Sequence, residues 1–141
     1  MPEMHHHIPI DASPEKVYEA IATQKGLQGW WTGDCMAEPR VGSVAEFGFY
    51  NRKIVFRMRI DELQPGKRVV WTCIGDYDEW KDTRLTWEIS QKEGGSLLNF
   101  VHGNWRSTTS FFASCNSTWG MLMYRLKDDV EGRKPGPFWK E

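Results

Sequence analysis

The chain has no excess of charge of either sign. Its 18 lysine and arginine residues nearly balance its 19 aspartate and glutamate residues, giving a formal net charge of −1. Nucleic-acid binding usually needs a basic surface, so no nucleic-acid partner is expected. The apolar runs are far shorter than the roughly 20 residues that span a bilayer, and the N-terminus has no signal-peptide pattern. We therefore expect a cytoplasmic protein without membrane insertion.

The sequence also lacks the cysteine spacing of disulfide frameworks and zinc sites. Cys35, Cys73 and Cys115 are odd in number, widely separated and form no Cys-x-x-Cys pair, so we expect reduced and mostly buried thiols. Residues 5–7 are consecutive histidines, but no carboxylate or thiol stands at ligand spacing. We predict no metal site and no cofactor.

Leucine is scarce, and aromatic residues supply much of the apolar bulk instead. The 141-residue chain is 40% hydrophobic and contains 8 tryptophans and 7 phenylalanines. This length and composition predict a single globular domain, residues 1–141, with residues 133–141 as a short tail. Rings of this size either fill a core or line a cavity.

The N-terminal third predicts one strand and two short helices. Residues 5–10 alternate as an extended strand, and Ser13 followed by Pro14 is a typical helix start. Apolar residues then recur at helical spacing until Lys25-Gly26, where we expect the helix to break. A second short helix is predicted over residues 27–31.

Between residues 44 and 102 the apolar period changes to two, which predicts five antiparallel strands joined by short turns. The clearest run is residues 54–60, where Phe56 and Met58 face one way and Arg57 and Arg59 the other. Both faces of residues 69–74 are apolar, so the direction of Trp71 stays open. Loop and tail positions make Trp80 and Trp139 poor candidates for lining a cavity.

After residue 108 the period returns to that of a helix. An apolar stripe extends over about five turns and predicts one long C-terminal helix, preceded by a cluster of capping residues and ended by glycine and proline after residue 131. The stripe consists of Phe112, Cys115, Trp119, Leu122, Met123, Leu126 and Val130. The predicted fold class is thus α+β.

The order of these elements and several motifs resemble one known superfamily, the START-like proteins, also called SRPBCC or Bet v 1-like. The branch that the chain resembles most is named after the activator of Hsp90 ATPase homologue 1. The similarity covers nearly the whole chain, and the motifs that carry it are residues 8–18, 27–34, 42–43, 86–89 and 98–105 and the helix with Trp119.

This resemblance implies a helix-grip fold, in which a curved antiparallel sheet of about six strands wraps around the C-terminal helix and leaves a cavity. It also implies a small apolar or aromatic ligand, lipid-like or polyketide-like, as the partner. The residues then expected to line the cavity or its mouth are Trp30, Trp31, Phe47, Phe49, Phe56, Met58, Trp87, Trp105, Trp119 and Met123.

Two alternatives stay open beside ligand binding, and so does a homodimer. The first is a cyclase or hydrolase that uses the same cavity, with His102 as the candidate acid or base, although a hydrogen-bonded structural histidine is favoured. The second is interaction with an Hsp90-type chaperone, for which 141 residues leave no room for the additional N-terminal domain of such activators.

Overall fold

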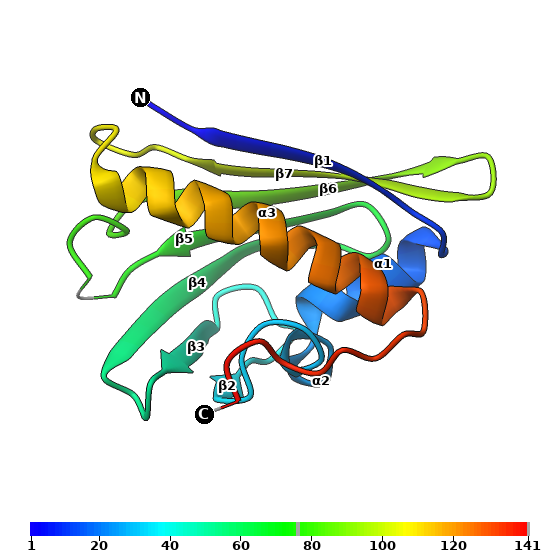
Figure 1. Ribbon diagram of the computed structural model, residues 1–141, viewed down its shortest axis with the longest axis horizontal. Coiled ribbons are helices and arrows are strands. Elements are labelled where there is room, and N and C mark those ends of the chain that lie inside the picture. Colours follow the sequence, from blue (N-terminus) through cyan, green and yellow to red (C-terminus); the bar gives the residue numbers. More distant parts are fainter. Residues whose placement is uncertain (76, 141) are drawn as a thin grey trace.

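The computed structural model describes residues 1–75 and 77–140, and its main element is a seven-stranded antiparallel sheet (Figure 1). The strands follow one another across the sheet in the order β1-β7-β6-β5-β4-β3-β2. Their bounds are β1 Met4–Ile10, β2 Cys35–Met36, β3 Val44–Phe49, β4 Ile54–Gln64, β5 Arg68–Cys73, β6 Arg84–Lys92 and β7 Gly95–Gly103. The helices are α1 Pro14–Ala22, α2 Gln24–Gln28 and α3 Ser110–Val130.

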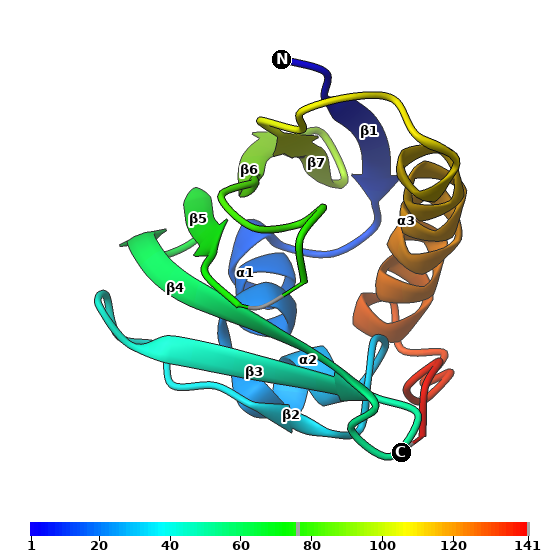
Figure 2. The same ribbon diagram turned by 90° about the vertical axis from the view of Figure 1, so that its left-hand side faces the viewer.

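The sheet curves strongly, and the long helix α3 closes its open side. Figure 2 looks along the molecule and shows the strands following an arc from β1 to β2, with α3 opposite the middle of that arc. The predicted α+β class and helix-grip architecture are confirmed. The seventh strand, β2, was not predicted because two residues are too few to show an alternating pattern.

The boundary between α1 and α2 lies at Thr23, which corrects the predicted break at Lys25-Gly26 and the helix predicted over residues 27–31. Thr23 ends α1 and also caps α2, since its side-chain oxygen accepts the Gly26 N–H at 3.0 Å. Gly26 lies inside α2 because α1 passes very close. A Cβ atom there would lie 2.2 Å from the Glu19 carbonyl oxygen.

Helix α3 begins and ends where the sequence predicts. Thr109 is its N-cap and accepts the Phe112 N–H at 3.1 Å, and the helix stops at Val130 before Gly132. Two contacts fix its C-terminal half beside β1. Lys127 Nζ donates to the Pro9 carbonyl at 2.8 Å, and the Asp11 N–H donates to Glu131 at 2.7 Å.

Most of the tryptophans fill the space between the sheet and α3. Six of them are at most 2% exposed, which makes the rings the bulk of the core. Trp71, whose direction the sequence left open, points inward and packs against Trp87 with ring centroids 5.4 Å apart. These six are Trp30, Trp31, Trp71, Trp87, Trp105 and Trp119.

None of the helices among the described residues combines the length and apolarity that crossing a membrane requires.

Candidate functional site

A pocket of about 200 Å³ lies between the N-terminal half of α3 and the hairpin that joins β3 to β4. Among the residues that the structure describes, thirteen line the pocket; eight of these are aromatic and none is charged. The lining consists of Trp31, Phe49, Tyr50, Ile54, Phe56, Trp80, Phe111, Ser114, Cys115, Thr118, Trp119, Leu122 and Trp139.

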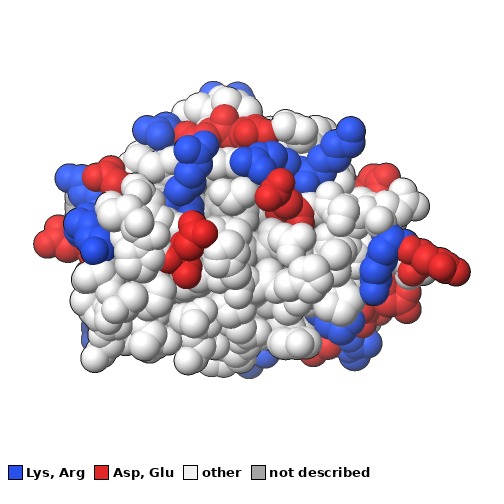
Figure 3. All heavy atoms as spheres, turned by 90° about the horizontal axis from the view of Figure 1, so that it is seen from above, with Lys and Arg blue, Asp and Glu red and all other residues white. Residues whose placement is uncertain are grey.

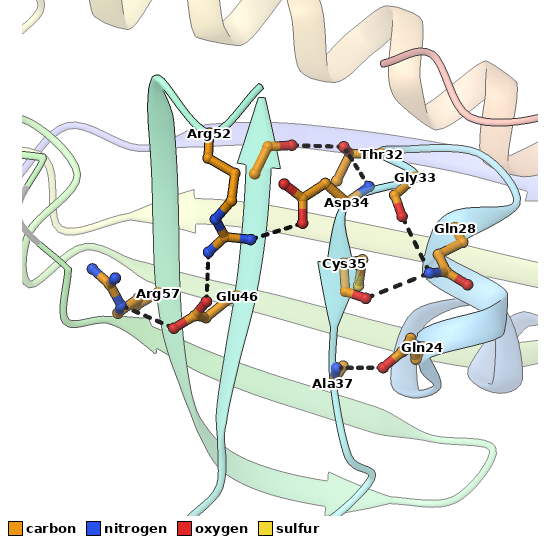
Figure 4. Close-up of polar contacts among 11 residues, drawn as sticks. Gln24, Gln28, Thr32, Gly33, Asp34, Cys35, Ala37, Glu46, Arg52 and Arg57 are labelled. Atoms are coloured by element: carbon orange, nitrogen blue, oxygen red, sulfur yellow. Dashed lines mark hydrogen bonds and ion pairs between the residues drawn. The ribbon is translucent and has the colours of Figure 1, made fainter. Parts of the chain in front are cut away.

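The hairpin at the pocket rim has an unusual backbone. Tyr50, Asn51 and Arg52 follow one another with φ of 55°, 57° and 64°, a region that costs L-residues on the order of 1 kcal/mol each. Arg52 anchors this hairpin by forming ion pairs with Asp34 at 2.8 Å and Glu46 at 2.7 Å (Figure 4). These contacts tie the hairpin to the segment around β2 and so fix Tyr50 at the rim.

Glu46 lies at the centre of this polar network (Figure 4). Hydrogen bonds from Arg52 and Arg57 hold the pKa of its carboxyl below the ordinary value. Nearby, the Thr32 hydroxyl is fully buried and donates to the Gly48 carbonyl at 2.7 Å. The network therefore acts as a structural brace for the pocket wall.

The tail forms another wall of the pocket. The backbone N–H of Trp139 donates to the Trp31 carbonyl at 3.0 Å, and the backbone carbonyl of Trp139 accepts the Gly33 N–H at 2.8 Å. Its ring packs edge-on against Phe49, with centroids 5.0 Å apart. Arg125 of α3 fixes the tail further upstream by donating to the Pro135 and Gly136 carbonyls.

The structure divides the ten residues predicted to line a cavity into two groups. Four of them, Trp31, Phe49, Phe56 and Trp119, line the pocket. The other six lie in the packed core away from the pocket lining, and Trp30, expected near the mouth, is fully buried with its Nε1–H bonded to the Ala20 carbonyl. These core residues are Trp30, Phe47, Met58, Trp87, Trp105 and Met123.

Trp80 and Trp139 line the pocket although their loop and tail positions argued against it. Trp80 is only 4% exposed because its ring stacks on Phe56 with centroids 3.9 Å apart. No periodicity exists in a loop or tail to reveal such a placement. Their size was the only available signal, since a large ring is rarely left in solvent.

His102 is a structural residue in this fold. It is completely buried, and burial lowers the pKa of its imidazole to about 3. Nδ1 accepts the Trp119 Nε1–H at 3.1 Å, so the proton is on Nε2, which lies 2.9 Å from the Thr83 hydroxyl. Thr83 in turn donates to the Trp80 carbonyl at 2.5 Å. A neutral ring with both nitrogens engaged is unsuited to acid–base chemistry on a ligand.

The three cysteines are free thiols, with Cys35 and Cys73 buried and Cys115 half-buried at the pocket. Burial raises the pKa of all three, to about 12 for Cys35 and about 11 for Cys115. At neutral pH they are therefore protonated and poor nucleophiles. No group of three metal-binding side chains occurs among residues 1–75 and 77–140.

The sequence pattern of the family described as activator of Hsp90 ATPase homolog 1-like protein matches residues 11–131. The chain belongs to this family. No curated protein matches the sequence of the chain.

Solved structures include a similar relative and many distant ones. The solution structure of the Aha1 dimer from Colwellia psychrerythraea is 36% identical over 95% of this chain and 99% of that one, with a TM-score of 0.88. A protein from Chromobacterium violaceum (24% identity, TM-score 0.77, 92% and 96% coverage) and an AHSA1-like protein from Aeromonas hydrophila (14%, 0.74, 94% and 94%) share the fold.

Proposed function

We propose that this family member binds a small, flat, apolar molecule in the pocket between α3 and the β3–β4 hairpin. The observation that carries the proposal is the lining, which is mostly aromatic and, over residues 1–75 and 77–140, contains no charged side chain. Sites for small molecules are typically apolar and aromatic, with a few polar groups that orient the ligand. Here the hydroxyls of Tyr50, Ser114 and Thr118 supply those polar groups.

The pocket volume narrows the ligand class. At about 200 Å³ the pocket is slightly larger than the roughly 150 Å³ apolar cavities that hold benzene, and smaller than the roughly 300–1,000 Å³ of sites for drug-sized ligands. One or two fused rings with a single hydroxyl or carbonyl match this space. A long-chain lipid, which the family resemblance also implied, requires a larger cavity.

A thermal-shift assay with indole, 2-naphthol and palmitate tests the proposal. A ligand that binds the native state alone raises stability by about 2.7 kcal/mol at a concentration of 100 times Kd. We expect indole or 2-naphthol to raise the melting temperature and palmitate to have no effect. Unchanged melting with both ring compounds would overturn the proposal.

Two variants locate the binding site. Cys115→Phe places a ring inside the pocket and should abolish the shift, whereas Val44→Phe adds the same ring on the exposed side of β3, where 46% of the residue is accessible, and should preserve it. Equal shifts in the two variants would place the ligand elsewhere. Circular dichroism of both variants verifies that they are folded.

Family membership favours a second proposal, interaction with an Hsp90-type chaperone, because that activity gives the family its description. The test is the ATPase rate of such a chaperone with and without this protein. A rate that does not change at saturating protein contradicts this second proposal. The enzyme alternative gains no support from His102, whose two ring nitrogens are engaged within the core.

We also propose that the chain forms a homodimer, as the Colwellia psychrerythraea relative does.

A further inference from the structure

The N-terminal half of α3 carries no charged residue. Between Arg106 and Arg125 there are eighteen consecutive residues without Lys, Arg, Asp or Glu, although 26% of the whole chain is charged. Many of these residues are nevertheless exposed, so burial does not explain the absence of charge. The exposed positions of this half are Ser110, Ala113, Ser114, Asn116, Ser117, Met121 and Tyr124.

The other helical surfaces of the molecule carry charged residues, as exposed helix surfaces usually do. The C-terminal end of α3 carries Lys127, Asp128 and Asp129, and α1 exposes Glu15 and Lys16. Figure 3 looks down on β1 and α3 and shows a broad uncharged area, with the charges gathered along one edge and at the ends. β1 adds to this area because it too contains no Lys, Arg, Asp or Glu.

We infer that the outer face of α3 over residues 110–124, which we name the α3 face, is the surface through which two copies of this chain meet. This inference rests on the proposed homodimer and adds the surface. In a dimer with two-fold symmetry each patch contacts its own copy, so any net charge on the patch would face the same charge. The α3 face meets that condition because it carries no charge at all.

The side chains of the α3 face suit a helix packed against a second copy of itself. Ala113 and Ser117 lie four residues apart on one side of the helix and are small, which lets two helices approach to about 8 Å. Met121 and Tyr124, which are 36% and 58% exposed, extend from the same side. In an antiparallel pair these two side chains cover Ser110 and Ala113 of the other copy.

The size of the α3 face predicts a weak dimer. Fifteen helical residues are about 22 Å long, so a strip that includes the side of β1 buries about 500 Å² per copy. A total near 1,000 Å² is at the low end for specific interfaces. We therefore expect a reversible equilibrium with a Kd on the order of 10–100 μM rather than a permanent dimer.

Sedimentation equilibrium of the purified chain from 5 μM to 1 mM tests the inference. The parent chain should shift from monomer to dimer over this range, and 0.5 M NaCl should not dissociate the dimer, because no ion pair holds it. Ser117→Arg and Met121→Glu should each raise Kd at least tenfold. Val44→Glu, a matched change at an exposed apolar residue on β3, should leave Kd unchanged.

The outcomes separate the dimer from its surface and from the pocket. A parent chain that stays monomeric at 1 mM overturns both the homodimer and the α3 face. Dimers that persist in Ser117→Arg and Met121→Glu retain the homodimer and overturn the α3 face. Neither result affects ligand binding, because the shift with 2-naphthol is measured at about 0.5 μM, well below the expected Kd of the dimer, where the chain is mostly monomeric. Melting temperatures of the two variants near that of the parent verify their fold.

Discussion

Mild acid should destabilise this protein at a pH where most carboxylates are still ionised, because His102 must stay neutral in the core. The pKa of His102 is about 3 in the native state, against about 6.5 in an unfolded chain. Between these values the unfolded state binds a proton that the native state does not. Native stability is therefore complete above pH 6.5 and is lost as the pH falls toward 3.

The magnitude follows from the width of that window. Each pH unit within it costs about 1.4 kcal/mol, so a change from pH 7.5 to pH 5.0 should lower the free energy of unfolding by about 2 kcal/mol through His102 alone. Urea denaturation followed by tryptophan fluorescence at the two pH values measures this loss. His6 adds a smaller loss of the same sign, since burial lowers its pKa as well.

His102→Gln isolates the contribution of the buried imidazole. A glutamine amide can accept the Trp119 Nε1–H and donate to Thr83 without titrating. At pH 7.5 the free energy of unfolding of the variant should be about 1–3 kcal/mol lower than that of the parent, because the geometry of its hydrogen bonds is imperfect. Between pH 7.5 and pH 5.0 the variant should then lose about 2 kcal/mol less stability than the parent loses. An identical pH dependence in His102→Gln and the parent would refute the reasoning.

Four further substitutions test the packing of the fold and of the pocket. Gly26→Ala should lower the free energy of unfolding, measured by thermal unfolding, by more than 2 kcal/mol, because the new Cβ would lie 2.2 Å from the backbone of α1. Gly120→Ala should instead raise it by about 0.5–1 kcal/mol, because the nearest side-chain atom is 3.5 Å away and alanine favours the helix. Trp139→Ala should enlarge the pocket and admit bulkier naphthalene derivatives in the thermal-shift assay, and a size preference equal to the parent's would contradict its position as a wall. Arg52→Ala should cost at most about 1 kcal/mol, since the Arg52 side chain is 42% exposed, and 1 M NaCl should reduce that cost. A salt-independent cost would show that the ion pairs are not its source.

Periodic patterns predicted the elements well because burial repeats along a strand or a helix. Phe47, Phe49 and Phe56 occupy the inward positions that alternation assigns to them, and Trp119 lies on the buried side of α3 as the helical stripe predicts. These patterns report only which side of an element is buried. They do not distinguish a ring that packs in the core, such as Phe47, from one that borders the pocket, such as Phe49.

The pocket itself required information that no local pattern contains. Trp80 and Trp139 become pocket walls through contacts with Phe56 and Phe49, which are distant in sequence. Gly26 shows the same limit for element boundaries. Its lack of a side chain predicts a break in the helix, whereas in the fold it allows the close packing of α1 against α2.

The walls of the pocket come from Trp31 and from Trp139, more than one hundred residues further along the chain. Bringing these two residues together closes a loop of more than one hundred residues, and the rest of the fold must offset the entropic cost of that closure. A chain in which either of these two segments has unfolded therefore lacks a complete pocket. A compound that binds there is linked to the global unfolding equilibrium, so it should slow hydrogen exchange of the deepest core amides as well as those near the pocket.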